Sequence, residues 1–328
     1  MKFVIENFEQ NNCPDAMNEF LNYLTTIRGK SPNTVNAYRT DLTLFFKFLM
    51  LYKGKVPNNT DFDEISIKEI DKFFLRGITL SDLYAFIAFV EKYRHNGSYA
   101  KARKVATLKS FFKYLLGKAR IIDENPALEL ESPKINKRNP IYLTLDESRK
   151  LLLNMDETSK NYYRDYCIIT LFLNCGMRLS ELCSININEI KGDTLSIIGK
   201  GNKERTIYLN TACLRAIEDY LRVRDGSKLP PEDKNALFVS AKNQRINKRT
   251  VERLVKKYTN NAGLEYNKYT PHKLRHTAAT LMYKHGSVDI RNLQKLLGHE
   301  SIATTQIYTH VDDEKLREAV NSNPLKDL

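Results

Sequence analysis

The apolar residues of this chain repeat at helical spacing in two long blocks, and a segment rich in proline and lysine separates these blocks. The first block runs from residue 15 to residue 118. In it, segment 31–52 starts with Ser31, a favourable N-cap, and Pro32, which suits the first position of a helix. An apolar stripe at helical spacing follows: Leu42, Leu44, Phe45, Phe48 and Leu49. Segments 79–95 and 98–118 look similar, so we expect a helical first domain over 15–118.

Residues 119–140 are the expected linker between the two blocks. Its second part holds three prolines and three basic residues: Pro126, Pro133, Pro140, Lys134, Lys137 and Arg138. Prolines disfavour helix and are typical of linkers. The second block, 141–328, opens with "TLDESRKLL", where Thr144 and Glu147 match a capping box. We therefore expect a second domain over 141–328.

One stretch of the second block departs from the helical pattern. In segment 194–210, two runs of β-prone residues flank "GKGNKE", which predicts a hairpin with a glycine-containing turn. Segment 236–240, "ALFVS", is a candidate for a further short strand. The predicted fold class is therefore mainly α with a small β-sheet.

Composition narrows the class of partner. A chain of 328 residues suits two domains, and its formal net charge is +13. Such an excess of lysine and arginine favours a polyanion such as nucleic acid, although a basic surface that only aids solubility is the alternative. Five cysteines without a CxxC pattern indicate neither a disulfide framework nor a zinc ribbon. With no signal peptide and no long apolar run, we expect a reduced, cytoplasmic protein without a membrane partner.

Two arginines lie in patterns that suit anion binding. Arg178 and Glu181 are three residues apart on an expected helix, so they can touch. They are either a surface ion pair or an inward arginine held by a carboxylate. Segment 269–286 places His272 and Arg275 on one face of the first turns of another expected helix, where free N–H groups attract anions. The alternative there is a polar cap that faces water, and His276 is expected to be buried rather than catalytic.

Three further residues are candidates from their local setting. Lys200 lies between Gly199 and Gly201 in the predicted hairpin turn, where it is either solvated or able to reach a neighbouring groove. His299 follows Gly298, the expected end of a helix. Tyr308 lies in a short last helix and, as one of 18 tyrosines, could simply be a packing residue.

Together these residues suit chemistry at a phosphodiester. Arginine binds phosphate through two parallel hydrogen bonds, and phosphoryl transfer depends mainly on positioning and charge neutralisation. Nearby cations would favour the phenolate of a tyrosine nucleophile. These segments hold few of the clustered carboxylates that metal-dependent nucleases use. We therefore expect no metal ion and no cofactor.

Four stretches contain these residues in a fixed order: "GMRLSEL", "GKGNKER", "HKLRHT" and "LLGHESIATTQIYTH". In this order and at these spacings, the chain resembles a tyrosine recombinase of the phage-integrase and Xer type. The interval of nine residues from His299 to Tyr308 agrees with that family. The resemblance covers nearly the whole chain and implies a helical N-terminal core-binding (SAM-like) domain. It also implies a mostly α catalytic α/β domain, and the two domains form a C-shaped clamp on DNA.

The resemblance implies that Tyr308 attacks the scissile phosphate, forms a 3′-phosphotyrosyl bond and releases a 5′-hydroxyl. Arg178 and Arg275 would bind the non-bridging oxygens. The free 5′-hydroxyl of a partner strand would then reverse the reaction, so that strands exchange through a Holliday junction.

The other three site residues would serve proton transfer. The resemblance implies that Lys200 is the general acid on the leaving 5′-oxygen, and that His272 and His299 hydrogen-bond the phosphate and assist proton transfer. A homo- or hetero-tetramer would act on double-stranded DNA at a specific recombination site. The C-terminal segment, 312–328, would dock on a neighbouring protomer.

Two sets of basic residues are candidate DNA contacts. In the first domain they are Lys101, Arg103 and Lys104. In the second, segment 246–258 is expected to enter the major groove, with Lys248 and Arg249 as base-reading candidates. Each of these residues could instead be only a solvated charge.

The alternatives are a type IB topoisomerase and a DNA-binding protein of this fold without catalysis. Within the family, an integrase of a phage or mobile element often has an extra arm-binding domain, and only about 14 residues precede the first block here. This favours a Xer-like role in resolving chromosome or plasmid multimers, with a second recombinase or a DNA translocase as possible partners.

Overall fold

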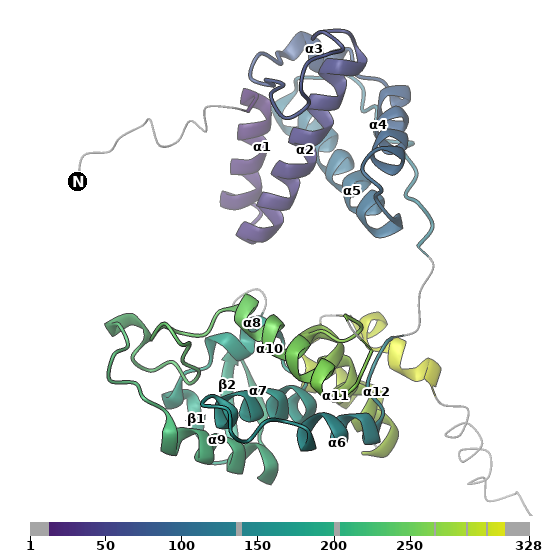
Figure 1. Cartoon of the computed structure of the whole chain (residues 1–328). Helices are drawn as coiled ribbons and strands as arrows, with labels where there is room; N and C mark the ends of the chain where they lie inside the picture. Colours follow the sequence, from purple (N-terminus) through teal and green to yellow (C-terminus); the bar gives the residue numbers. More distant parts are fainter. Residues whose placement is uncertain are drawn as a thin grey trace, which may run out of the picture. The chain divides into compact units, whose positions relative to one another are not determined.

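The computed structural model describes residues 13–135, 140–199, 204–265, 267–286, 288–299 and 301–311. The chain divides into two compact units, Met1–Lys137 and Arg138–Leu328. Figure 1 shows the elements of both units, coloured along the sequence. The predicted fold class is confirmed, because the described residues are mainly helical and carry one small sheet of three strands. None of the described helices is both long and apolar enough to cross a membrane.

The first unit is helical. Its helices are α1 (Asp15–Thr26), α2 (Pro32–Tyr52), α3 (Lys72–Arg76), α4 (Leu80–Lys92) and α5 (Ser98–Tyr114), and a π-helical turn, Leu115–Ala119, follows α5. Ser31 caps α2 as predicted, since its side chain accepts a hydrogen bond from the Thr34 N–H. Aromatic side chains fill the core between α1, α2, α4 and α5, among them Phe20, Phe45, Phe86 and Phe111. Phe20 meets Phe111 edge to face, as Phe45 meets Phe86, which is a favourable geometry for aromatic rings.

A buried carboxylate joins α2 to α5 in this unit. Asp41 of α2 accepts hydrogen bonds from Arg103 (2.5 Å) and Thr107 (3.0 Å), and it pairs with Lys104 at 3.1 Å. Lys104 is only 5% exposed. Because a buried charge is stable only when it is paired, Asp41 and Lys104 depend on each other.

The second unit surrounds helix α7 (Tyr162–Cys175), which is buried along most of its length. It packs against α6 (Leu145–Leu153), α9 (Thr211–Val223) and α11 (Pro271–His285). The other α-helices among the described residues of this unit are α8 (Leu179–Ser184), α10 (Lys248–Asn261) and α12 (Ile290–Leu297). The predicted capping box is present at α6, where the Thr144 N–H donates to Glu147 at 2.8 Å.

The sheet is antiparallel in the order β1 (Ile190–Lys191), β2 (Thr194–Ile198), β3 (Glu204–Tyr208), and Leu195 pairs with Ile207. Strands β2 and β3 form the predicted hairpin. The predicted strand at 236–240 is wrong, since this segment makes only isolated bridges, at Ala236 and Val239. Side chains hydrogen-bond to the backbone of Val239 instead of a neighbouring strand. The Val239 N–H donates to the Tyr220 hydroxyl, and the Val239 carbonyl accepts from Arg164.

The last described segment is built of two 3₁₀ turns, Ile302–Thr304 and Gln306–Val311, rather than the single short helix expected from the sequence. Tyr308 lies in the second turn. Its ring packs against Ala279, Leu293 and Leu297, which joins this segment to α11 and α12.

Candidate active site

Glu181 lies at the centre of an arginine cluster in the second unit. Gly176, with φ +58°, ends α7, and Arg178 then serves as the N-cap of α8. Glu181 accepts hydrogen bonds from the Arg178 backbone N–H (2.6 Å) and Nη1 (2.7 Å), and from Arg205 Nη2 (2.9 Å). Of the two alternatives for Arg178, the structure therefore shows the inward arginine held by a carboxylate, rather than a surface ion pair.

The charge state of Glu181 follows from these contacts. Its burial favours the neutral acid, but the hydrogen bond from the Arg178 N–H and the charges of Arg205 and Arg178 outweigh burial. The pKa of Glu181 consequently lies below its ordinary value. One carboxylate thus holds guanidinium groups that would otherwise repel one another.

Arg275 is the most buried arginine of the cluster. It is 3% exposed, and its Nη1 lies 3.9 Å from a Glu181 oxygen. Among the described residues, Nη1 has no hydrogen-bond partner. Burial and the Arg178 charge lower the pKa of Arg275 to about 10, so it remains a cation at neutral pH. A buried cationic donor without a partner is suited to an incoming anion.

The same three arginines hold the end of α12. Arg205 donates to the carbonyl of Leu296, Arg275 to that of Leu297 (2.7 Å), and Arg178 to that of Gly298 (2.6 Å). Carbonyls at a helix C-terminus lack partners within the helix and carry partial negative charge, so cations stabilise them. Gly298 has φ +63°, and a Cβ there would lie 3.0 Å from Arg205. The three hydrogen bonds hold residues 296–298 in place. This corner at the end of α12 directly precedes His299.

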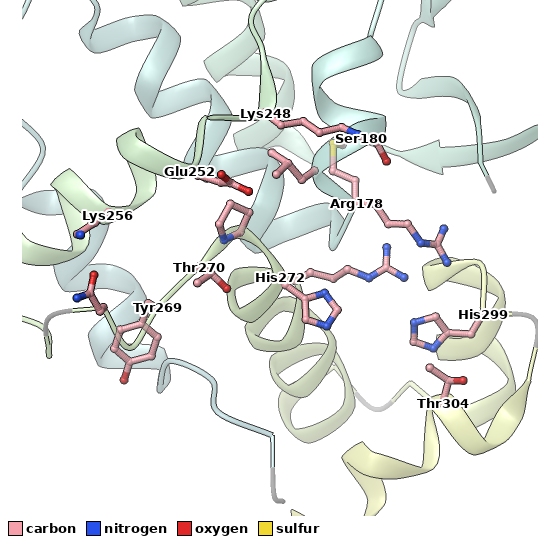
Figure 2. A pocket seen from close by; sticks show the side chains of 15 residues that line it. Arg178, Ser180, Lys248, Glu252, Lys256, Tyr269, Thr270, His272, His299 and Thr304 are labelled. Carbon is pink, nitrogen blue, oxygen red and sulfur yellow. The ribbon is translucent and has the colours of Figure 1, made fainter. Parts of the chain in front are cut away.

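A cavity of about 790 Å³ lies against this cluster. Arg178, Arg275, His272 and His299 line it, and Lys248 lines it from α10. Figure 2 shows Arg178, His272 and His299 grouped at one end of the cavity, while Lys256 and Tyr269 lie at the other end. The cavity thus joins the arginine cluster to the basic helix α10.

Helix α11 supplies His272 as the sequence predicted. The Thr270 hydroxyl caps the helix by accepting from the Lys273 N–H at 3.4 Å, and Pro271 occupies its first turn. His299 Nδ1 lies 2.9 Å from the Thr305 hydroxyl. Burial, together with the charges of Arg275 and Arg178, lowers the pKa of both histidines, to about 4 for His299. Both rings are therefore neutral at pH 7.

Tyr308 lies beside the cavity but does not line it. It is 1% exposed, and its hydroxyl lies 2.7 Å from His276 Nδ1. Burial raises the pKa of Tyr308 to about 12, although the Arg275 charge acts in the opposite direction. The phenol is therefore protonated at neutral pH.

The structure brings Arg178, His272, Arg275 and His299 to one cavity, with Tyr308 adjacent. Lys200 and the segment 312–328 lie outside the described residues. Sequence reasoning missed Arg205 as a member of the cluster. The spacing on β3 could have indicated it. Arg205 lies two residues before buried Ile207, and side chains two positions apart on a strand point to the same face.

The candidate DNA contacts differ in their exposure. Lys248 and Arg249 are exposed at the start of α10. Lys101 pairs with Glu91 at 2.6 Å, and the exposed Arg103 pairs with Asp41. Lys104 is the exception, because burial against Asp41 leaves its ammonium group without access to a phosphate in this conformation.

The free energy of unfolding should fall as the solution is acidified from pH 7 to pH 5. The pKa of His276 and of His299 is lowered to about 4 in the folded chain, from 6.5. Between these values the unfolded chain binds more protons, so acid favours unfolding, with a slope of about 1–2 kcal/mol per pH unit. Urea denaturation at several pH values measures this slope. It should decrease in His299→Gln and stay unchanged in a variant of exposed His285, and equal slopes in all three would contradict the assignment.

Arg205→Gln should slow any reaction at this cavity by about 10- to 100-fold, because it loosens the corner that carries His299. The variant loses the bonds to the Leu296 carbonyl and to Glu181. Single-turnover rates measure the effect, with the exposed pair member Arg222, changed to Gln, as the control. An unchanged rate in Arg205→Gln would exclude this positioning role.

Comparison with known proteins decides the family. The model of the phage integrase family matches residues 142–315, which include the whole arginine cluster. The chain belongs to the phage integrase family. The family's N-terminal SAM-like domain also matches, at residues 17–76. The resemblance noted in the sequence is thus confirmed.

Individual relatives give the same result. Tyrosine recombinase XerC of Caldanaerobacter subterraneus subsp. tengcongensis is 58% identical over 95% of this chain and 87% of its own length. The enzyme is accordingly a Xer-like tyrosine recombinase, a site-specific DNA recombinase.

Solved structures agree in fold. A post-cleavage complex of XerH with palindromic difH substrate has a TM-score of 0.70 at 22% identity, covering 93% of this chain and 84% of that one. A lambda integrase tetramer bound to a Holliday junction has a TM-score of 0.63 at 17% identity, covering 92% and 82%. At these identities the similarity supports the fold.

Proposed function

We propose that this recombinase cleaves one strand at a specific duplex site by attack of Tyr308, and rejoins it to a partner strand through a Holliday junction. The observation that carries the proposal is the buried Arg275 Nη1, which has no partner among the described residues and belongs to a guanidinium that lines the cavity beside Tyr308. A phosphodiester carries the negative charge and the non-bridging oxygens that guanidinium groups bind. Arg178 and Arg275 bind its non-bridging oxygens, which neutralises the charge that develops on them.

The neighbouring residues complete the proposed site. His272 and His299, both neutral at pH 7, donate hydrogen bonds to the phosphate. Lys200 protonates the leaving 5′-oxygen. The Tyr308 hydroxyl reaches the phosphorus when DNA is bound, because catalytic contacts that are long in a free enzyme commonly tighten in the complex with substrate. Neither a metal ion nor a cofactor takes part in this scheme.

The proposed biological role is the resolution of chromosome or plasmid multimers in the cytoplasm by a tetramer on DNA. The similarity to XerC supports this role over integration of a phage or mobile element. A structurally similar integrase binds a Holliday junction as a tetramer, which supports the stoichiometry. In this role the two domains clamp the duplex, segment 312–328 docks on a neighbouring protomer, and a second recombinase or a DNA translocase is a candidate partner.

Covalent capture tests the proposal. Duplex sites selected by binding from a random pool are nicked near the cleavage position, incubated with the protein in EDTA and run on a denaturing gel. The nick lets the short 5′-hydroxyl fragment diffuse away, so the phosphotyrosyl complex accumulates. A covalent band supports the proposed reaction. Tight binding without a band, even after a partner recombinase is added, would contradict it.

Lys248→Ala should weaken DNA binding several-fold and reduce the salt dependence of binding by about one counterion. Lys248 is exposed at the start of α10 and lines the cavity that holds the arginines. Binding titrations at several salt concentrations measure both effects. Exposed Lys160, which precedes α7, changed to Ala, is the control. If the affinity of Lys248→Ala and that of the unmodified protein depend equally on salt concentration, Lys248 does not contact the DNA.

A further inference from the structure

His276 has a specific partner that the proposed reaction has not used. It follows His272 by one turn of α11, and the two rings meet edge to face with centroids 4.5 Å apart. His272 is at the cavity, while His276 Nδ1 lies 2.7 Å from the Tyr308 hydroxyl. A distance of 2.7 Å is that of a good hydrogen bond to a hydroxyl. The Tyr308 ring also packs against Ala279, Leu293 and Leu297.

The neighbours of His276 determine its protonation. Burial, together with His272, Arg275 and Lys273 on its own helix, lowers its pKa to about 4. From the packed elements, Tyr308 and His299 face it. Because its neighbours are cationic or neutral, His276 is a neutral imidazole at pH 7, and one ring nitrogen has a free lone pair. A lone pair on Nδ1 can accept the phenolic hydrogen.

His299 and the two arginines of the site are less well placed for this task. His299 Nδ1 is engaged by the Thr305 hydroxyl at 2.9 Å. The guanidinium groups of Arg178 and Arg275 cannot accept a proton. Among the described residues, His276 is the base whose ring nitrogen lies within hydrogen-bond distance of the Tyr308 hydroxyl.

We propose that His276 is a catalytic residue, the general base that removes the phenolic proton of Tyr308 during strand cleavage. This inference rests on the proposed function of Tyr308 as the nucleophile. As the Oη–P bond forms and the P–O5′ bond breaks, the phenolic proton passes to His276 Nδ1, and the leaving oxygen takes its proton from a separate acid. In the reverse step the imidazolium returns the proton to the departing phenolate, as microscopic reversibility requires.

A substrate with a sulfur atom in place of the bridging 5′-oxygen isolates this step. A thiolate is a good leaving group without protonation, so the pH dependence of cleavage reports proton removal from Tyr308. The unmodified protein should form covalent complex at a rate that hardly changes between pH 6 and pH 9. His276→Gln keeps a hydrogen-bonding side chain but cannot take a proton. Its rate at pH 7 should be about 10²- to 10⁴-fold lower and rise about tenfold per pH unit, since hydroxide must replace the base.

Two further variants separate catalysis from structure. His276→Ala should regain cleavage when imidazole is added, whereas a variant that is only misfolded would not. His285 lies exposed at the other end of α11, so His285→Gln is the matched control and should cleave like the unmodified protein. DNA binding should be the same for every variant.

The outcomes distinguish this inference from the proposed function. If the unmodified protein forms no covalent complex, both fail. If it cleaves and His276→Gln cleaves as fast or faster, the contact only holds Tyr308 at rest, and the base assignment fails. A slower variant whose pH profile runs parallel to that of the unmodified protein, and which imidazole does not rescue, also overturns it.

Discussion

Tyr308→Phe should abolish covalent capture of DNA while leaving DNA binding within about twofold of the unmodified protein. The substitution removes one oxygen atom, which is the proposed nucleophile, and keeps the ring that packs on Leu293 and Leu297. Removing a nucleophile typically reduces the rate by several orders of magnitude, which here means no visible band. Stability should fall by only about 1–2 kcal/mol, because the hydrogen bond to His276 is lost.

Tyr220→Phe is a matched control for this experiment. Tyr220 is also buried in the second unit, and within the part of the chain that the structure describes its hydroxyl likewise has one hydrogen-bond partner, the N–H of Val239 at 3.1 Å. The control should lose similar stability and keep full cleavage. A covalent band that persists in Tyr308→Phe would identify another residue as the nucleophile and would remove the basis for assigning His276 as a base.

Local rules predicted much of this structure. Ser31, Thr144 and Thr270 cap the helices that the sequence assigns to them, because capping depends on residues three positions apart. The contact between Arg178 and Glu181 was predictable for the same reason. The hairpin 194–210 followed from residue preference and its glycine turn.

Contacts between side chains and the backbone of distant segments could not be predicted from the sequence. The sequence does not show that Arg178, Arg205 and Arg275 donate to three successive carbonyls at the end of α12, because every residue has a carbonyl. The buried position of Tyr308 and its contact with His276 also depend on how α11 and the last turns pack. Segment 236–240 has the composition of a strand, yet side chains rather than a neighbouring strand satisfy its backbone at Val239.

Glu181→Ala should destabilise the second unit by about 3–5 kcal/mol, the cost typical of removing one partner from a buried charge network. Glu181 is 2% exposed and faces Arg178, Arg205 and Arg275. Without its carboxylate, the three cations repel one another in a region of low dielectric constant. Only the hydrogen bonds of the three arginines to the carbonyls at the end of α12 then hold the corner before His299. Because the site loses this support, cleavage should also be lost. Urea denaturation measures the stability change.

Glu189→Ala is the control, because Glu189 also closes a capping box but bonds only to Asn186 among the residues described. It should cost about 1 kcal/mol and leave cleavage intact. Phosphate provides a second check on Glu181→Ala. If the cluster is a phosphate site, phosphate should stabilise Glu181→Ala more than it stabilises the Glu189 variant, since an anion replaces the missing charge. If Glu181→Ala is as stable as the Glu189 variant, or phosphate affects both equally, the three arginines do not depend on this carboxylate.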